Sequence, residues 1–324
     1  MINFRYHIVS LTAVFLALAV GLAMGTTFLN HATVDQLKRQ IRSAERGIDK
    51  TNGTNQSLKD ELDRANKDDA TLIEDAMSQL LPGQLSDQPV LVVAADGIDR
   101  DSLDNLRAAL TDAGADLRGT LVLTSALRSD AGNDDDLAAA VEEAPGTLRN
   151  TLEAKAASTF ATALRNAADR DASSTAGASQ SVQRLLAGGF LRFDAPAAAV
   201  PPLDGSTVLA GGGYRYVFVS GPDPKTPDDE FLLPVVSNLA ADGPAPVVVA
   251  SAAIGADAET DRTLVVGPIR NDKALASDVS TVDDLERFSG LVATVLAVRD
   301  LDAPARGHYG LGDGASGGSI PTAP

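Results

Sequence analysis

The chain opens with a long uncharged apolar stretch that predicts a membrane-spanning helix. Residues Ile8 to Leu29 carry no charge. At about 1.5 Å per residue, a helix of this length crosses the roughly 30 Å hydrocarbon core of a bilayer. A cleaved signal peptide is the alternative, because Arg5 precedes the stretch and small residues lie at Ala23–Gly25. The stretch is longer than a usual signal core, so we expect residues 1–30 to form an uncleaved transmembrane anchor.

The orientation of the anchor depends on its flanking charges and on the length of the polar body. Arg5 favours a cytoplasmic N-terminus, whereas Lys38, Arg39 and Arg42 on the other side favour the reverse. A long hydrophilic domain crosses a membrane largely regardless of such charges. We therefore expect a single-pass cell-membrane protein with its N-terminus inside and its body extracytoplasmic.

A heptad pattern follows the apolar stretch and predicts a coiled-coil stalk over residues 31–81. Apolar and small positions alternate at spacings of three and four from Val34 to Leu72, as in a helix that wraps around a partner helix. Asn55 lies at a core position, where asparagine specifies register and a low oligomer number. Gly47 and Asn52-Gly53 are poor helix formers, so a break or a helical hairpin there is the alternative.

Both N-terminal segments carry a face suited to self-association, and together they predict a parallel homodimer. Small residues recur at every fourth position of the anchor, which lets two membrane helices approach closely. The alternative is that alanine and glycine are simply common in membrane helices. The residues expected to contact the second copy are Gly21, Gly25, Leu37, Ile41, Ile48, Asn55, Leu58 and Leu62.

The remaining chain predicts an α/β domain over residues 82–302. Pro89–Ala95 is a continuous apolar run typical of a buried parallel strand, Asp101–Ala113 has one apolar helical face, and a second strand follows at Thr120–Thr124. This βαβ order favours a Rossmann-like three-layer fold. Further strands are expected at Phe190–Phe193, Ser206–Ala210, Arg215–Ser220, Val247–Ala250 and Thr263–Val266. Further helices are expected at Ala138–Ala168 with an interruption at Pro145-Gly146, and at Gln180–Ala187, Asp229–Ala241 and Asp283–Val298.

Composition adds an acidic body, an absence of cysteine and a tail rich in glycine and proline. The net charge is −17, and residues 1–50 hold six basic against three acidic residues, so the rest of the chain carries −20. A body this acidic repels nucleic acid and anionic lipid, so we expect no nucleic-acid partner. Without cysteine there are no disulfides or thiolate metal sites. Residues 303–324 lack apolar periodicity and are expected to form a flexible tail.

Candidate metal ligands are few. Asp96 follows the first strand, at the edge where open α/β sheets bind ligands, and with Asp99 and Asp101 it could supply oxygen ligands to a cation. Turn formation and helix capping are the simpler roles for these carboxylates. The three histidines and three methionines do not lie within ligand spacing of one another, which argues against a soft-metal site.

Catalytic chemistry is also sparse. A Ser–His–Asp site would depend on His308, in the predicted tail. The Gly211–Gly213 run lacks the spacing of a phosphate loop and indicates a turn. Asp223–Asp229 is a rigid polar loop that either docks a partner or is a solvated linker. We therefore expect no catalytic residues, no cofactor-binding residues and no enzymatic activity.

The two ends of the chain resemble a known family. The opening MINFRYHIVSLTAVFLALAVG looks like the leader of the MctB-type copper transport proteins of mycolic-acid-containing actinobacteria, and Gly307-His308-Tyr309-Gly310 is similar to a terminal motif of that family. The resemblance covers essentially the whole chain. It implies a membrane-anchored envelope protein of copper transport or copper homeostasis, with copper implied by the resemblance alone. It also implies a link to regulators of cell-wall hydrolases at division.

The residues themselves argue against a copper carrier or pore. The chain lacks the Met, His or Cys clusters expected of a carrier, and a single span cannot form a channel. The prediction is therefore a dimeric, non-enzymatic, membrane-anchored component resembling copper homeostasis proteins. The alternative is a scaffold or regulator of cell-wall hydrolysis and division, with an envelope or cell-wall regulatory protein as partner.

Overall fold

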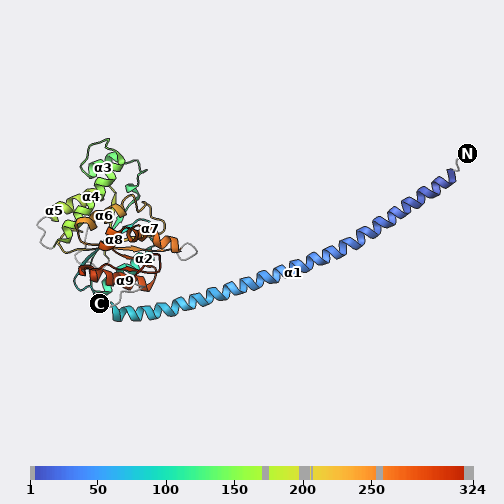
Figure 1. The fold of residues 1–324 in the computed structure, drawn as a ribbon, viewed down its shortest axis with the longest axis horizontal. Coiled ribbons are helices and arrows are strands. Elements are labelled where there is room, and N and C mark those ends of the chain that lie inside the picture. The colour runs from blue at the N-terminus through green and yellow to red at the C-terminus, as the bar shows by residue number, and fades with distance from the viewer. Residues whose placement is uncertain (1–3, 170–174, 197–204, 206, 253–257, 317–324) are drawn as a thin grey trace. The chain divides into compact units, whose positions relative to one another are not determined.

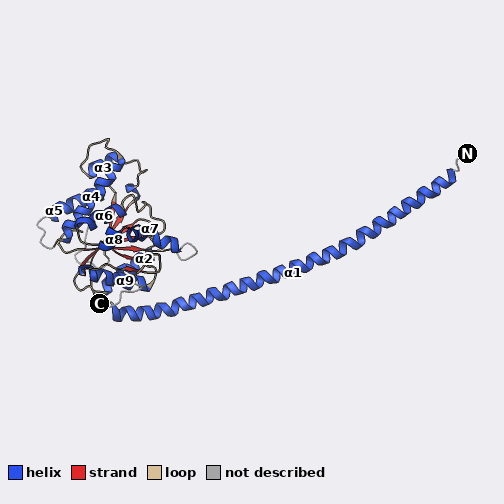
Figure 2. Cartoon of the chain, viewed as in Figure 1, coloured by secondary structure: helices blue, strands red, loops and turns tan. Residues whose placement is uncertain are grey.

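The computed structural model divides the chain into two compact units, Met1–Leu72 and Ile73–Pro324. It describes residues 4–169, 175–196, 205, 207–252 and 258–316 (Figure 1). The first unit is formed by a helix alone, whereas the second contains a sheet covered by helices (Figure 2).

The first unit is part of one uninterrupted helix, α1, which runs from Phe4 to Leu80. It continues through Thr51 and Thr54, whose hydroxyls donate to carbonyls four residues earlier at 2.9 Å, so the structure has neither the break nor the hairpin that we considered. Within α1, Arg5–Gly25 is apolar and long enough to cross a membrane, with a mean hydropathy of 2.3. It is the one such segment found among the described residues, and it confirms the expected N-terminal apolar helix.

The second unit is built on a mixed sheet of seven strands in the order β3-β2-β1-β4-β5-β6-β7. Every neighbouring pair is parallel except β2 and β3, which are antiparallel. The strands are β1 Pro89–Ala95, β2 Asp116–Leu123, β3 Leu191–Asp194, β4 Arg215–Ser220, β5 Val247–Ala250, β6 Ser280–Val282 and β7 His308–Tyr309. The predicted α/β class is therefore confirmed.

Helices cover both faces of this sheet, as Figure 2 shows. They are α2 Arg100–Asp112, α3 Asp134–Ala140, α4 Arg149–Ala168, α5 Thr175–Ala187, α6 Leu232–Asp242, α7 Ala258–Asn271, α8 Lys273–Asp278 and α9 Phe288–Arg299. Two short 3-10 helices, Ser125–Leu127 and Asp300–Asp302, join some of these elements.

Successive residues of each central strand point into two separate cores, because side chains alternate across a strand. In β1, Val90 and Val92 pack on α2 and α9, whereas Leu91 and Val93 pack on the face covered by α4, α6 and α7. All four valine and leucine side chains are fully buried, which explains the unbroken apolar run in the sequence.

The segment that follows α1 joins the smaller of these cores. Leu81 and Leu85 are 0% and 1% exposed and pack in the same cluster as α2 and α9. The Arg299 guanidinium donates to the Gln84 side-chain oxygen at 2.9 Å, which ties the same segment to the end of α9.

Two predicted strands are wrong. Thr263–Val266 lies inside helix α7, where Val265, Val266 and Ile269 share a buried face at helical spacing. The short apolar run resembled a strand because runs of four residues do not distinguish the two periods. Thr207–Leu209 of the expected strand Ser206–Ala210 forms a turn, and Ser206 itself lies outside the described residues.

The predicted last helix begins too early, and the strand at its start was missed. Helix α9 starts at Phe288, and Thr281, just before the predicted helix, belongs to β6. Asp283 and Asp284 are fully buried, so they do not form an exposed first helical turn. A strand of three residues is too short to show a period in the sequence.

The expectation of a flexible tail does not hold for residues 303–316. His308 and Tyr309 form β7, which pairs with Thr281 and Val282 of β6. The rest of the predicted tail, residues 317–324, lies outside the described residues.

A buried ion pair holds this C-terminal segment on the body. The Arg270 and Asp283 side chains are 2% and 0% exposed, and their charged atoms are 2.6 Å apart. Arg270 also donates to the carbonyls of Tyr309 and Asp313, and Asp283 accepts from the amide of Leu311. One charge pair therefore joins α7, β6 and the residues after β7.

We predict that Arg270→Ala lowers the free energy of unfolding by about 3–5 kcal/mol, because it leaves the Asp283 carboxylate buried without its cation. Urea denaturation of the full-length protein in detergent measures this change. The matched control is Arg128→Ala, since Arg128 and Asp130 form an exposed pair at 2.8 Å and its loss is expected to change stability little. Equal effects of the two substitutions would contradict the prediction.

Candidate functional site

The carboxyl edge of the sheet is where an open α/β fold is expected to bind ligands. In the sheet, β1 has β2 on one side and β4 on the other. The chain runs from β1 outward to β2 and β3, and then returns to β4 and continues outward on the other side to β5, β6 and β7. The strand order therefore reverses between β1 and β4. A crevice opens at such a point in many α/β sheets. Here the chain places Asp96 after β1 and Ser220 at the end of β4.

A loop of the protein itself covers this edge. Within residues 221–230, here called the covering loop, the Lys225 amide donates to the Asp96 carbonyl at 2.7 Å and its ammonium lies 2.8 Å from the Asp96 carboxylate. The Thr226 hydroxyl donates to the carbonyl of Thr124 at the end of β2. Gly97 has φ +110, and a Cβ there would lie 2.5 Å from the Asp223 carbonyl, so the two segments pass too closely for a side chain.

The covering loop is fastened at both of its ends. The Ser220 hydroxyl lies 2.7 Å and 2.9 Å from the two carboxylate oxygens of Asp228, which is 9% exposed. Glu230 accepts from the amide and the hydroxyl of Ser129 at 2.8 Å and 2.9 Å. The loop is therefore not a solvated linker, whereas the docking of a partner on it stays a prediction.

Burial changes the acidity of the loop's anchoring carboxyl. Desolvation raises the pKa of Asp228 to about 6; the hydrogen bond from Ser220 lowers it and the neighbouring Asp229 charge raises it further. At neutral pH this carboxylate is charged in a site that favours its protonated form.

The three candidate metal ligands have separate roles in the structure. Asp96 pairs with Lys225 and lies 3.9 Å from Arg192. Asp99 caps α2, since it accepts from the Ser102 amide at 2.9 Å, and Asp101 is exposed in the first turn of that helix. Among the described residues, no three histidine, cysteine or acidic side chains are grouped so as to hold a metal ion.

His308 is held by the protein through both ring nitrogens. Nδ1 lies 2.9 Å from the Thr281 hydroxyl and Nε2 lies 3.1 Å from the Ala276 carbonyl. Burial lowers the pKa of His308, and the nearby Arg270 charge lowers it further, against the Ala276 hydrogen bond that raises it. A neutral ring that donates from Nε2 and accepts at Nδ1 satisfies both contacts.

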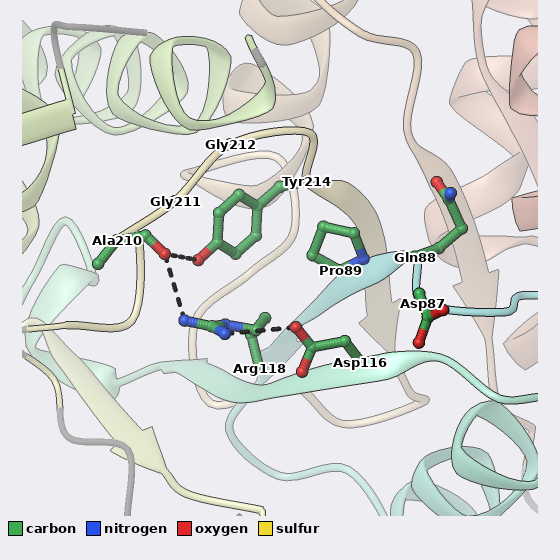
Figure 3. Close-up of a pocket in the computed structure, with 9 residues that line it drawn as sticks. All are labelled: Asp87, Gln88, Pro89, Asp116, Arg118, Ala210, Gly211, Gly212 and Tyr214. Atoms are coloured by element: carbon green, nitrogen blue, oxygen red, sulfur yellow. Dashed lines mark hydrogen bonds and ion pairs between the residues drawn. The ribbon is translucent and has the colours of Figure 1, made fainter. Parts of the chain in front are cut away.

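A polar pocket of about 490 Å³ lies at the opposite, amino edge of the sheet (Figure 3). Its lining comes from the segment before β1, the start of β2 and the turn before β4. The lining residues are Asp87, Gln88, Pro89, Asp116, Arg118, Ala210, Gly211, Gly212 and Tyr214. The volume lies within the range of about 300–1,000 Å³ typical of ligand sites.

Arg118 and Tyr214 form the fixed part of this pocket. Arg118 lies 3.3 Å from the Asp116 carboxylate, donates to the Ala210 carbonyl at 3.2 Å and has its guanidinium carbon 5.8 Å from the centre of the Tyr214 ring. Burial raises the pKa of Tyr214, against the opposing effect of Arg118, so the phenol stays protonated and donates to Ala210 at 2.7 Å. Figure 3 shows both side chains converging on this carbonyl.

The sequence did not reveal the pocket, because its residues come from three separate segments and form no motif. The Gly211–Gly213 run was identified as a turn, and the structure shows that Gly211 and Gly212 form part of the pocket wall. Knowledge of which strands are neighbours would have been needed to bring Asp116, Arg118 and Tyr214 together.

The predicted dimer contacts lie along α1. Leu37, Ile41 and Ile48 are 51%, 52% and 59% exposed in the single chain. Gly21, Gly25 and Asn55 also lie on the exposed surface of the helix. The side chains of Leu58 and Leu62 lie outside the described residues, and the dimer itself stays a prediction.

Comparison with known proteins identifies the family. Residues 1–320 match the family described as “Copper transport outer membrane protein, MctB”. The chain belongs to the MctB family. It is 26% identical over 325 residues to the proteins named copper transporter MctB in Mycobacterium bovis and in two strains of Mycobacterium tuberculosis, CDC 1551 and H37Rv. These alignments cover 97% of this chain and 98% of each relative.

In this member of the MctB family, the C-terminal Gly-His-Tyr-Gly motif has a clear structural role. His308 and Tyr309 form β7, and Gly310 follows at φ +124. A Cβ built on Gly310 would collide with the carboxylate of Asp283, so only glycine lets the chain pass the buried ion pair. The motif therefore forms the last strand at one edge of the sheet.

We predict that Asp228→Asn stabilises the protein at pH 7 by roughly 1–3 kcal/mol and has little effect near pH 4. Because the folded-state pKa is raised, the stability that protonated Asp228 contributes is present at low pH and is lost as the pH rises from 3.8 through about 6. The asparagine oxygen still accepts from Ser220 without a charge. Thermal unfolding across this pH range measures the difference.

The control for this experiment is Asp229→Asn, because Asp229 is the exposed neighbour in the same loop. The stability difference between wild type and Asp229→Asn is expected to be smaller and to depend less on pH. A stability difference between wild type and Asp228→Asn that does not grow with pH would sink the prediction.

Proposed function

We propose that the protein is a single-pass envelope protein that acts as a dimeric, non-enzymatic component of copper homeostasis. The observation that carries this is the family match over residues 1–320, together with full-length relatives named as copper transporters. The apolar segment Arg5–Gly25 supplies the membrane anchor, with the N-terminus inside and the body extracytoplasmic.

Dimerisation is supported by the apolar stripe on α1. Leu37, Ile41 and Ile48 are more than half exposed, although they occupy core positions of the heptad. Full burial of such a side chain contributes roughly 1.5–3 kcal/mol, so a second copy of the helix gains several such contacts in a parallel coiled coil. Asn55 and the small residues Gly21 and Gly25 fit the same arrangement.

A non-enzymatic role is supported by the covered edge of the sheet. The strand order and the helices on both faces favour a Rossmann-like domain. In such a domain the reaction site is expected beside Asp96, where Lys225 and Thr226 of the covering loop now lie. The loop takes the place that a substrate or nucleotide would need.

The same features support a role in assembling partners instead of carrying copper. His308, the one histidine of the body, has both ring nitrogens bonded to protein atoms. A dimer anchored in the membrane could instead position an envelope protein that handles the metal. The alternative of a scaffold for regulators of cell-wall hydrolysis uses the same anchor and the same dimer.

We predict that Ala44→Cys gives disulfide-linked dimers when membranes that contain the variant are treated with an oxidant, and that Arg46→Cys does not. The chain has no cysteine, so each variant carries a single thiol. Ala44 lies on the heptad stripe, where two parallel helices bring equivalent residues close enough for a disulfide, and Arg46 lies on the opposite side. Non-reducing electrophoresis measures the yield; equal yields from both positions would contradict the coiled-coil dimer.

We predict that a strain lacking this gene is more sensitive to copper than its parent and that the wild-type chain restores growth. The double variant Ile41→Asp/Ile48→Asp should express but fail to restore it, because charges at core positions separate the two helices. Growth across a copper series, with zinc as the control metal, measures this. Unchanged copper sensitivity in the deletion strain would remove the copper role and favour the cell-wall alternative, for which division and cell-wall phenotypes are the readout.

A further inference from the structure

We propose that the pocket at the amino edge of the sheet, lined by Asp87, Gln88, Asp116 and Arg118, binds an uncharged carbohydrate. This inference does not depend on the proposed copper role, because none of the pocket residues belongs to the anchor, the heptad stripe or the covering loop. It concerns a surface of the extracytoplasmic body alone.

The pocket is already formed in the free protein. The Arg118 guanidinium is fixed by Asp116, by the Ala210 carbonyl and by the Tyr214 ring, and its side chain is 20% exposed. Asp87 is held at φ +56, a backbone conformation that non-glycine residues adopt rarely. Ligand sites are commonly built in advance in this way, because less freedom is then lost on binding.

Two polar atoms in the pocket wall lack hydrogen-bond partners among the described residues. Gln88 Oε1 is a buried acceptor and Arg118 Nε is a buried donor. Buried polar groups are nearly always paired in native proteins. Both atoms are closed off from solvent, so the hydrogen bonds to a ligand come from the exposed Asp87 and Asp116 carboxylates and from the rest of the Arg118 guanidinium.

The charges of the pocket disfavour an anionic ligand. Two carboxylates, Asp87 and Asp116, surround one guanidinium, Arg118, so the lining carries a net negative charge. A phosphate or another multiply charged anion would be repelled by the carboxylates and by the acidic body. A hydrocarbon ligand would leave the carboxylates and the guanidinium without their water.

The mixture of donors and acceptors selects sugars among uncharged ligands. Carboxylates only accept hydrogen bonds, a guanidinium only donates them, and the Gln88 amide does both. A sugar hydroxyl also donates and accepts, and a sugar ring carries several of them side by side. In the view of Figure 3 the Pro89 ring lies between Tyr214 and Gln88, and its apolar surface can contact the C–H groups of a sugar.

Backbone at the rim leaves room for such a ring. Gly211 and Gly212 line the pocket without side chains, and Gly211 has φ +108, a conformation that glycine adopts without strain. A Cβ on Gly211 would lie 3.9 Å from the Tyr214 hydroxyl, so a larger residue there would narrow the entrance beside Tyr214. The turn before β4 therefore both connects the chain and shapes the pocket entrance.

The test is a binding titration of the full-length protein with cellobiose and N,N′-diacetylchitobiose. The protein is kept in a polyoxyethylene detergent, because maltoside and glucoside headgroups would themselves compete. Saturable binding of either disaccharide at up to millimolar concentration, followed by calorimetry or by protein-observed NMR, is the expected result. Binding of neither sugar, or saturable binding of inorganic phosphate in their place, would overturn the proposal.

Three variants locate the binding. Arg118→Ala should weaken it about tenfold or more, because a hydrogen bond to a charged group is lost. Asp87→Gly should weaken it too while keeping the fold, since glycine suits φ +56 and Asp87 is exposed. Arg128→Ala is the matched control, because Arg128 also pairs with an aspartate two residues away but lies outside the pocket.

Thermal unfolding of each variant separates loss of binding from loss of fold. If the Arg118→Ala variant does not fold, the binding measured for Asp87→Gly decides whether the pocket holds the sugar. The Asp87→Gly variant is expected to fold, because glycine adopts the backbone angle of this position without strain. Sugar binding that is unchanged in Asp87→Gly, or equally weakened in Arg128→Ala, would place the sugar elsewhere and refute the assignment.

Discussion

The buried ion pair between Arg270 and Asp283 is the interaction on which the completed sheet depends. A charge pair at 2.6 Å with almost no solvent exposure is stable only when its remaining hydrogen-bonding positions are also filled. Here they are filled by backbone groups of the C-terminal segment. The ion pair and strand β7 therefore need each other: the strand supplies the pair's partners, and the pair holds a strand of two residues that could not persist alone.

This mutual dependence explains which parts of the fold the sequence could predict. Long apolar runs such as Pro89–Ala95 and Arg215–Ser220 were found because burial on both faces of a parallel sheet leaves a clear signal. Strands β6 and β7 were missed because three and two residues are too few to show a period, and because the segment of β7 is held by hydrogen bonds to Arg270 and Asp283 and not by an apolar run. Charged residues distant in sequence gave no local sign that they would meet inside the protein.

The candidate sites divide in the same way, into features with a local sequence signal and features that join distant segments. Asp99 was correctly considered as a helix cap, since capping depends on residues three apart. The covering loop and the amino-edge pocket were not predicted, because each brings together segments from β1, β2 and β4. Family membership was recognised from the leader and the terminal motif, and the structure shows that this motif forms the last strand of the sheet beside Asp283, with His308 hydrogen-bonded to Thr281 and Ala276.

The way that α1 ends has a mechanical consequence. Its last residues lead directly into Leu81 and Leu85, which are buried among α2 and α9, and into Gln84, which is bonded to Arg299. Tension applied to the anchor therefore enters the body through a packed core, not through an edge strand. Strands at the edge of a sheet can be pulled off one hydrogen bond at a time, whereas a packed core resists until many contacts break together. A body loaded in this way keeps its sheet intact until that core gives way.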